Sequence, residues 1–132
     1  MSEESLYAAV RFRARFRCEY CQLPEAASGL TFPIDHVIAR QHGGKTIMAN
    51  LALSCPRCNQ HKGPNLATIE WPSQALIRLF RPREDRWTDH FKFDGAVIVG
   101  MTRIGIATAR LLDMNSARRV ATRQWLIAEG LF

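Results

Sequence analysis

Two C-x2-C pairs constrain this chain more than any other feature. The first is Cys18-Glu19-Tyr20-Cys21, and the second opens the run Cys55-Pro56-Arg57-Cys58. Four cysteines in a short secreted protein would suggest two disulfides, but the paired C-x2-C spacing in a reducing compartment favours a metal ion. We therefore predict a structural Zn²⁺ ion held by Cys18, Cys21, Cys55 and Cys58.

The length of the chain makes such a metal useful. With 132 residues and a mass of 15.0 kDa, the chain can bury a modest core, near the size at which a metal helps to hold the fold together. We expect a single domain over residues 1–132. In this interpretation residues 1–65 form the zinc-clamped core, and residues 66–132 form an extension that packs on it.

The charge distribution points to a polyanionic partner. The formal net charge is +6, which divides into +3 over residues 1–65, −1 over 66–77 and +4 over 78–132. Both ends are therefore basic. Arginine outnumbers lysine among the cations, and its planar guanidinium suits phosphate recognition, so we predict nucleic acid as the partner. A basic surface that serves only solubility is the alternative.

The N-terminus carries no sign of a signal peptide or membrane anchor. Met1 is followed by Ser2, Glu3 and Glu4, and no stretch approaches the roughly eighteen apolar residues of a membrane span. We therefore expect a cytoplasmic protein with no membrane partner. The sequence identifies no interface, so it is compatible with both a monomer and a homodimer.

The first half reads as a helix, two strands and a second helix. Residues 5–17 have the pattern of an amphipathic helix, and residues 30–34 read as a strand that continues through Asp35-His36 to residue 39. Residues 51–53 look like a second short strand. The run from Pro56 should form a helix that stops at Gly63.

The second half predicts a hairpin and two helices. A short strand or turn is expected over 75–80, and a hairpin over 91–99, with Asp94-Gly95 in a type I′ turn. Helices follow over 102–112, capped by Thr102, and over about 116–129, capped by Asn115 or Ser116. In the last helix we expect an apolar stripe and outward-facing arginines. The stripe comprises Ala117, Val120, Ala121 and Trp125, and the arginines are Arg118, Arg119 and Arg123.

The residues between and after the cysteine pairs form an ordered set. Asp35-His36 and Asn50 lie in the 33-residue gap (22–54), and Asn59 directly follows the last cysteine, ahead of Lys62-Gly63. The gap is far longer than the roughly fifteen to twenty residues of a simple zinc ribbon. The set resembles the HNH endonuclease family over roughly residues 17–63. The resemblance implies an α+β fold with a treble-clef-like ββα-metal core, to which the C-terminal β-hairpin and two helices are added.

The resemblance also implies a metal-dependent endonuclease that hydrolyses phosphodiester bonds in DNA, with RNA as the other substrate class. His36 would be the general base, which suits a neutral imidazole near neutral pH. Asp35 and Asn59 would hold a Mg²⁺ or Mn²⁺ ion, for which oxygen ligands are appropriate. Asn50 matches the residue that holds the base in place, and capping the turn before Leu51 is a compatible role for it.

Other polar residues near these motifs are weaker predictions. His61 is an alternative ligand for the catalytic cation, and an imidazole there would admit a softer ion such as Ni²⁺. By the resemblance, Arg57 and Lys62 would lie near the scissile phosphate. Arg15 and Arg17 belong to a run of arginines of which one or two could contact nucleic acid. A solvated helix face is the alternative for each.

A second function remains open at the level of sequence. The same fold could be a zinc-stabilised nucleic-acid-binding module without catalysis. The Asp35-His36 pair is the feature that argues against this alternative, because a module that only binds has no need of it.

Overall fold

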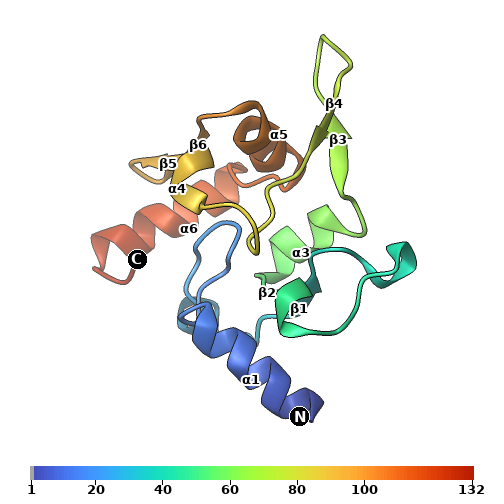
Figure 1. Cartoon of the computed structure of the whole chain (residues 1–132). Helices are drawn as coiled ribbons and strands as arrows, with labels where there is room; N and C mark the ends of the chain where they lie inside the picture. The colour runs from blue at the N-terminus through green and yellow to red at the C-terminus, as the bar shows by residue number, and fades with distance from the viewer. Residues whose placement is uncertain (1) are drawn as a thin grey trace.

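The computed structural model describes residues 2–132 and combines short helices with three antiparallel strand pairs (Figure 1). The predicted α+β class is confirmed. The strand pairs are β1 with β2, β3 with β4, and β5 with β6. Each pair is a local hairpin, so the helices and the cysteine cluster must connect the pairs to one another.

The first helix, α1 (Glu3–Arg13), is shorter than predicted at its C-terminal end. Ser2 caps it, and its hydroxyl accepts a hydrogen bond from the Ser5 N–H. Arg15 and Phe16 both have positive φ angles, which turn the chain back toward Cys18. The predicted continuation to Arg17 is therefore wrong, because the chain reverses before the first cysteine pair.

The hairpin and helix at the centre agree with the predicted ββα arrangement. Strand β1 (Ile34–His36) pairs antiparallel with β2 (Leu51–Leu53), and α3 (Pro56–Lys62) follows and ends at Gly63. The first strand is shorter than predicted, because β1 covers only three residues, although Pro33 and Val37 each make one more backbone hydrogen bond beside it. Short helical segments lie in the connections: α2 (Glu25–Ser28), η1 (Arg40–His42) and η2 (Met48–Asn50).

The second half contains two further hairpins and two helices. Strand β4 (Leu76–Arg78) lies in the region where a strand or turn was expected, and its partner β3 (Ala67–Ile69) was not predicted. The short helix α4 (Trp87–His90) precedes β5 (Phe91–Asp94), which pairs with β6 (Val97–Gly100). Helices α5 (Arg103–Leu111) and α6 (Ala117–Ala128) begin at the predicted caps Thr102 and Ser116.

The turn of the β5–β6 hairpin is displaced by one residue from the prediction. Asp94 pairs with Val97, so the two loop residues are Gly95 and Ala96. Gly95 has a φ of 58°, whereas Ala96 is not among the residues with positive φ. A positive φ at the first loop position alone is the signature of a type II′ turn, not of type I′.

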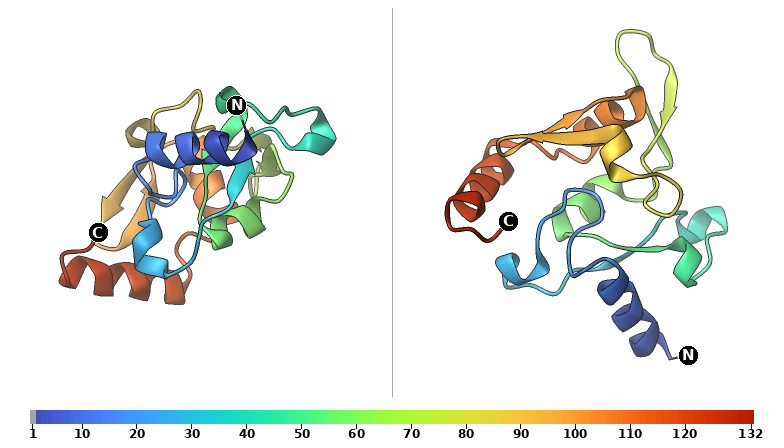
Figure 2. Two further views of the ribbon diagram at one scale, coloured as in Figure 1. Left: turned by 90° about the horizontal axis from the view of Figure 1, so that it is seen from below. Right: turned by 60° about the vertical axis from the view of Figure 1, so that its left-hand side comes forward.

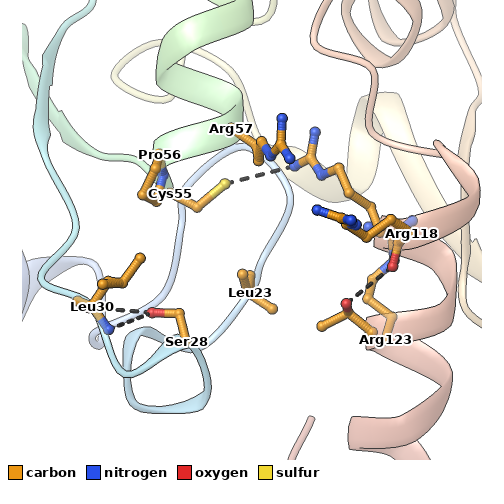
Figure 3. Close-up of a pocket in the computed structure, with 10 residues that line it drawn as sticks. Leu23, Ser28, Leu30, Cys55, Pro56, Arg57, Arg118 and Arg123 are labelled. Carbon is orange, nitrogen blue, oxygen red and sulfur yellow. Dashed lines mark hydrogen bonds between the residues drawn. The ribbon is translucent and has the colours of Figure 1, made fainter.

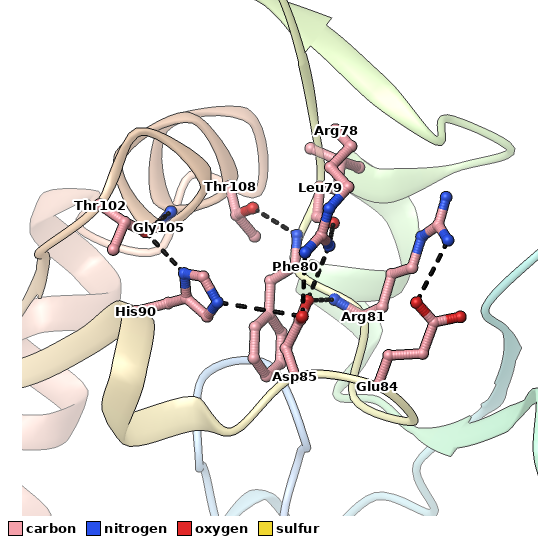
Figure 4. Close-up of polar contacts among 10 residues, drawn as sticks. All are labelled: Arg78, Leu79, Phe80, Arg81, Glu84, Asp85, His90, Thr102, Gly105 and Thr108. Atoms are coloured by element: carbon pink, nitrogen blue, oxygen red, sulfur yellow. Dashed lines mark hydrogen bonds and ion pairs between the residues drawn. The ribbon is translucent and has the colours of Figure 1, made fainter.

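A polar network ties the exit of β4 to α4 and α5 (Figure 4). Asp85 accepts two hydrogen bonds from Arg78, at 2.8 and 3.0 Å, and one from the Arg81 N–H. The buried Thr108 hydroxyl accepts the Phe80 N–H at 2.9 Å. Arg78 and Arg81 are thus balanced by the nearby carboxylates of Asp85 and Glu84.

The core runs through both halves of the chain. One cluster of buried residues extends from Val10 to Met114 and includes all four cysteines. Trp87 links the halves directly, because its indole N–H donates to the Tyr20 carbonyl at 2.8 Å. In both views of Figure 2 the loop after α1 lies between α1 and α6. Within residues 2–132, no helix is long and apolar enough to cross a membrane.

Candidate functional site

The four cysteines converge on one point inside the protein. Their sulfur atoms all lie within 4.8 Å of one another, and all four residues are buried. The Sγ atoms of Cys21 and Cys55 are 3.7 Å apart, too far for a disulfide, whose sulfurs are about 2.05 Å apart. A tetrahedral zinc ion with bonds of about 2.3 Å separates its sulfur ligands by about 3.8 Å. The four thiols are therefore positioned to form a metal site, and their geometry and chemistry fit zinc.

The backbone around each cysteine pair is arranged to stabilise thiolates. The Cys21 N–H points at Cys18 Sγ, and the Cys58 N–H points at Cys55 Sγ, both at 3.4 Å. Cys55 is the N-cap of α3. Its sulfur accepts a hydrogen bond from one of the N–H groups in the first turn, which have no partner within the helix. The two pairs therefore share the same arrangement, in which the N–H of the second cysteine points at the sulfur of the first.

A guanidinium from the C-terminal helix completes this centre. Arg119 donates to Cys58 Sγ at 3.0 Å and to Cys55 Sγ at 3.6 Å, and its other nitrogen donates to the carbonyls of Leu112 and Asp113. Burial lowers the pKa of Arg119, but the charges of Cys58 and Cys21 outweigh this effect and raise it. Arg119 thus balances part of the negative charge of a zinc–thiolate centre.

The inward direction of Arg119 corrects the prediction for α6. Arg119 is half-buried; Arg123 is buried and donates to the carbonyls of Ala96 and Met114, whereas Trp125 is 59% exposed. The buried face of α6 therefore follows the spacing of Arg119, Arg123 and Leu126. The prediction missed this face because it assigned every arginine of the helix to the solvent-exposed side. The i, i+4 spacing of Arg119 and Arg123, followed three residues later by Leu126, was the sequence signal that these residues share one face of the helix.

We expect Arg119→Met to loosen the metal centre. The substitution removes a charged donor from two thiolates, and the loss of such an outer partner typically weakens metal affinity by about 10- to 100-fold. The measurement is the rate of zinc transfer to a chromogenic chelator at neutral pH. Arg118→Met, at the exposed neighbouring position, is the matched control. Equal rates for the two variants would contradict the role of Arg119.

Asp35 lies in the interior at the centre of β1, with an exposed fraction of 5%. The buried Tyr20 hydroxyl donates to its Oδ2 at 2.6 Å, and Lys62 Nζ lies 3.2 Å from Oδ2 and 3.3 Å from Oδ1. Burial raises the pKa of Asp35 above its ordinary value, although Lys62 and Tyr20 act in the opposite direction. Both carboxylate oxygens are therefore already engaged by internal donors.

Lys62 lies inside the fold, away from any surface on which it could meet a phosphate. Its exposed fraction is 2%, and its ammonium also donates to the carbonyls of His36 and Val37, each at 3.2 Å. The prediction that Lys62 contacts the scissile phosphate does not agree with this position. The last turn of α3 packs against the hairpin, so the lysine points toward Asp35 and not toward solvent.

His36 is half-buried at the end of β1, where the hairpin opens into the loop that leads to β2. Its Nε2 lies 2.9 Å from Thr46 Oγ1 and 3.3 Å from Arg40 Nε. Burial, followed by the positive charge of Arg40, lowers the pKa of His36 below its ordinary value. The imidazole is thus neutral near pH 7, and Thr46 and Arg40 are contacts that sequence reasoning did not identify.

The Asn50 side chain holds the loop between β1 and β2 together by hydrogen bonds to its backbone. Its Oδ1 accepts from the Ile38 N–H at 2.9 Å, and its Nδ2 donates to the carbonyls of Ile38 and Lys45. Gly44 permits this closure, because a Cβ there would lie 1.6 Å from the Ile38 carbonyl oxygen. Asn50 makes no direct bond to His36; it connects the two ends of the loop that carries Thr46.

The residues predicted to hold a catalytic cation do not form an open site in this arrangement. Asp35 is enclosed and neutralised by Lys62, and Asn59 is half-buried on α3. His61 points elsewhere, with its Nε2 3.9 Å from Asp113 Oδ2. Among residues 2–132, the four cysteines are the one set of three or more His, Cys, Asp or Glu ligands close enough to share an ion. The Asp35 carboxylate is already paired with the Lys62 ammonium.

The three predicted surface arginines differ in their environments. Arg57 is exposed at the start of α3, and Arg15 is exposed beyond the end of α1. Arg17 is half-buried, donates to the Gln22 carbonyl at 3.0 Å, and lies over the Phe132 ring at 5.5 Å. Arg17 therefore holds the turn that contains Cys18 and Cys21 in place, whereas the exposed side chains of Arg15 and Arg57 can contact a partner.

Comparison with known proteins agrees with the motifs. Residues 18–65 match the family model described as HNH endonuclease. No curated protein and no solved structure gives a significant match to the chain. The matched segment contains both cysteine pairs, the β1–β2 hairpin and α3. Residues 18–65 thus combine a match to the HNH endonuclease family model with a four-cysteine metal site, which indicates a nuclease-type function.

Proposed function

We propose that this protein is an endonuclease that hydrolyses phosphodiester bonds in DNA, with His36 as the general base. The observation that carries the proposal is the position of His36 within the family segment. Its ring is half-buried and neutral near pH 7, it follows Asp35 on β1, and a hydroxyl holds it from the loop side. A neutral imidazole that solvent can reach is suited to take a proton from an attacking water.

The two contacts of Nε2 correspond to two tautomers of His36, each with a different nitrogen as the base. When Nε2 carries the proton it donates to Thr46 Oγ1, and the lone pair of Nδ1 is free to accept a proton from water. When Arg40 donates to Nε2, that nitrogen is the acceptor and Nδ1 carries the proton. We assign the first tautomer to the reactive state. Thr46 is then the residue that orients the base.

Arg40 takes the role that the resemblance gave to Lys62. It is exposed on η1, and its guanidinium approaches the imidazole to 3.3 Å. A phosphodiester placed beside His36 would meet this guanidinium, which can stabilise the charge that develops on the phosphoryl oxygens. Lys62 instead acts from inside, where it holds Asp35 and the carbonyl of His36 in place.

A divalent cation on Asp35 and Asn59 is a further part of the proposal, with Mg²⁺ or Mn²⁺ ahead of Ni²⁺. Such an ion would supply positive charge to the phosphoryl group and the leaving oxygen. Because Lys62 occupies the carboxylate, binding would require the ammonium to leave Asp35. The role of His36 does not depend on this rearrangement.

The test is cleavage of supercoiled plasmid by zinc-loaded protein with Mg²⁺, Mn²⁺, Ni²⁺ or EDTA. We expect His36→Ala to reduce the rate of nicking by about 10²- to 10⁴-fold, the usual contribution of a general base. His42→Ala, which removes an exposed imidazole from the neighbouring turn, should leave the rate unchanged. Zinc content is measured after EDTA treatment, so that loss of the structural ion is not mistaken for loss of a catalytic one.

Two other results would change the proposal. If His36→Ala cleaves as fast as the wild type, the general base lies elsewhere. DNA binding without cleavage under every metal, together with no cleavage of a labelled RNA, would favour the non-catalytic binding module. The buried Asp35–Lys62 pair is the observation in favour of that second candidate, because it closes the predicted cation site.

A further inference from the structure

A cavity of about 470 Å³ lies between the start of α3, the N-terminal half of α6 and the segment after the first cysteine pair (Figure 3). Ten residues line it, of which four are arginines and none is acidic. The arginines are Arg57, Arg118, Arg119 and Arg123. We call this cavity, defined by those four residues, the arginine groove.

Two of the four arginines are committed to the fold. Arg119 is bonded to thiols and carbonyls, and Arg123 is buried against the carbonyls of Ala96 and Met114. A zinc ion with four thiolates carries a charge of −2, which these two guanidinium groups balance. The negative charge of the metal centre is therefore neutralised by Arg119 and Arg123, and it does not neutralise the arginines at the surface of the groove.

The other two arginines have no internal partner. Arg57 and Arg118 are both exposed, and within residues 2–132 neither guanidinium takes part in an ion pair or a hydrogen bond. They project from two different helices at the rim of the same cavity (Figure 3). The lining of this first cavity thus presents two uncompensated positive charges and contains no carboxylate.

The groove continues along the seam between α3 and α6. A second cavity of about 210 Å³ is lined by Arg57, Arg118 and Arg119 again, together with His61, Ser116 and Asp113. Leu23, Leu30 and Pro56 form an apolar wall in the first cavity, and Ser28 and Thr122 bring hydroxyl groups to it. An elongated polyanion with apolar parts between its charges matches this pattern better than a small isolated anion does.

We propose that the arginine groove binds the sugar–phosphate backbone of a nucleic acid, with Arg57 and Arg118 each contacting a phosphate. The inference rests on the proposed function only in taking nucleic acid as the partner. Helix α3 carries Arg57 on the groove side, whereas Lys62 at its other end reaches Asp35. The groove is therefore a binding surface separate from the residues around His36.

The test measures binding in a background that does not cut. Fluorescence anisotropy of a labelled 20-base-pair DNA is followed with full-length, zinc-loaded His36→Ala protein over a range of KCl concentrations. Each phosphate contact contributes about 0.9 to the slope of log K against log salt. Adding Arg57→Gln and Arg118→Gln together should weaken binding by about tenfold and reduce the slope by about 2.

Lys92→Gln is the control, since it removes one positive charge from an exposed position on β5, outside the groove. Zinc content and the thermal midpoint verify that each variant is folded. A slope for the double variant equal to that of the control would overturn the proposal. So would loss of poly-L-glutamate binding with unchanged DNA binding, which would assign the groove to an acidic protein. Cleavage by the wild type is scored separately, so failure of the nuclease proposal and failure of the groove proposal give different results.

Discussion

Removal of zinc is expected to unfold the cysteine-bearing half of the chain and to lower the thermal midpoint of the protein. The four ligands come from two segments 33 residues apart, and all four belong to the buried core cluster. Structural zinc contributes roughly 10–16 kcal/mol in zinc-finger peptides. This is as large as the whole net stability of an ordinary protein, roughly 5–15 kcal/mol. Without the metal, the cysteine-bearing half should therefore retain little of its native structure.

The measurement is thermal unfolding followed by circular dichroism, before and after treatment with a strong zinc chelator. A stoichiometry of one zinc per chain is determined on the same sample. Cys58→Ser should reproduce the effect without a chelator, and added zinc should restore the wild type but not the variant. An unchanged midpoint after demonstrated loss of zinc would show that the packed core alone holds the fold.

Lys62→Met is expected to destabilise the protein by about 3–5 kcal/mol, the usual cost of removing one partner of a buried ion pair. The substitution preserves much of the side-chain volume but leaves the Asp35 carboxylate charged and buried, with Tyr20 as its remaining side-chain donor. Burial already raises the pKa of Asp35 and Lys62 lowers it, so the pKa should rise further in the variant. The measurement is urea unfolding at saturating zinc.

A second substitution separates charge from packing. Asp35→Asn combined with Lys62→Met removes both charges, and it should recover much of the lost stability because no uncompensated ion remains inside. Lys92→Met, on the exposed face of β5, should change the free energy of unfolding by less than about 0.5 kcal/mol. A Lys62→Met effect as small as that of Lys92→Met would mean that Lys62 is not buried in solution.

Local signals were sufficient for much of the architecture. Pro56 and Gly63 mark the ends of α3, and Thr102 and Ser116 cap α5 and α6, because these residues satisfy or terminate the backbone of a helix through neighbours a few residues away. The cysteine spacing predicted one cluster. The pairing of β3 with β4 was missed, since neither strand has a strong pattern of its own.

The sequence by itself determined the metal cluster, the hairpin and helix that lie around it, and the resemblance of residues 18–65 to the HNH endonuclease family. Only the tertiary structure decided which charged residues are internal. Lys62 meets Asp35 from 27 positions away, and Arg119 meets Cys58 from 61 positions away. When only the neighbouring sequence is considered, Lys62 and Arg119 each look like solvent-exposed residues. A charge can be buried only where an opposite charge and hydrogen-bond partners surround it, and those partners come together only when distant segments pack.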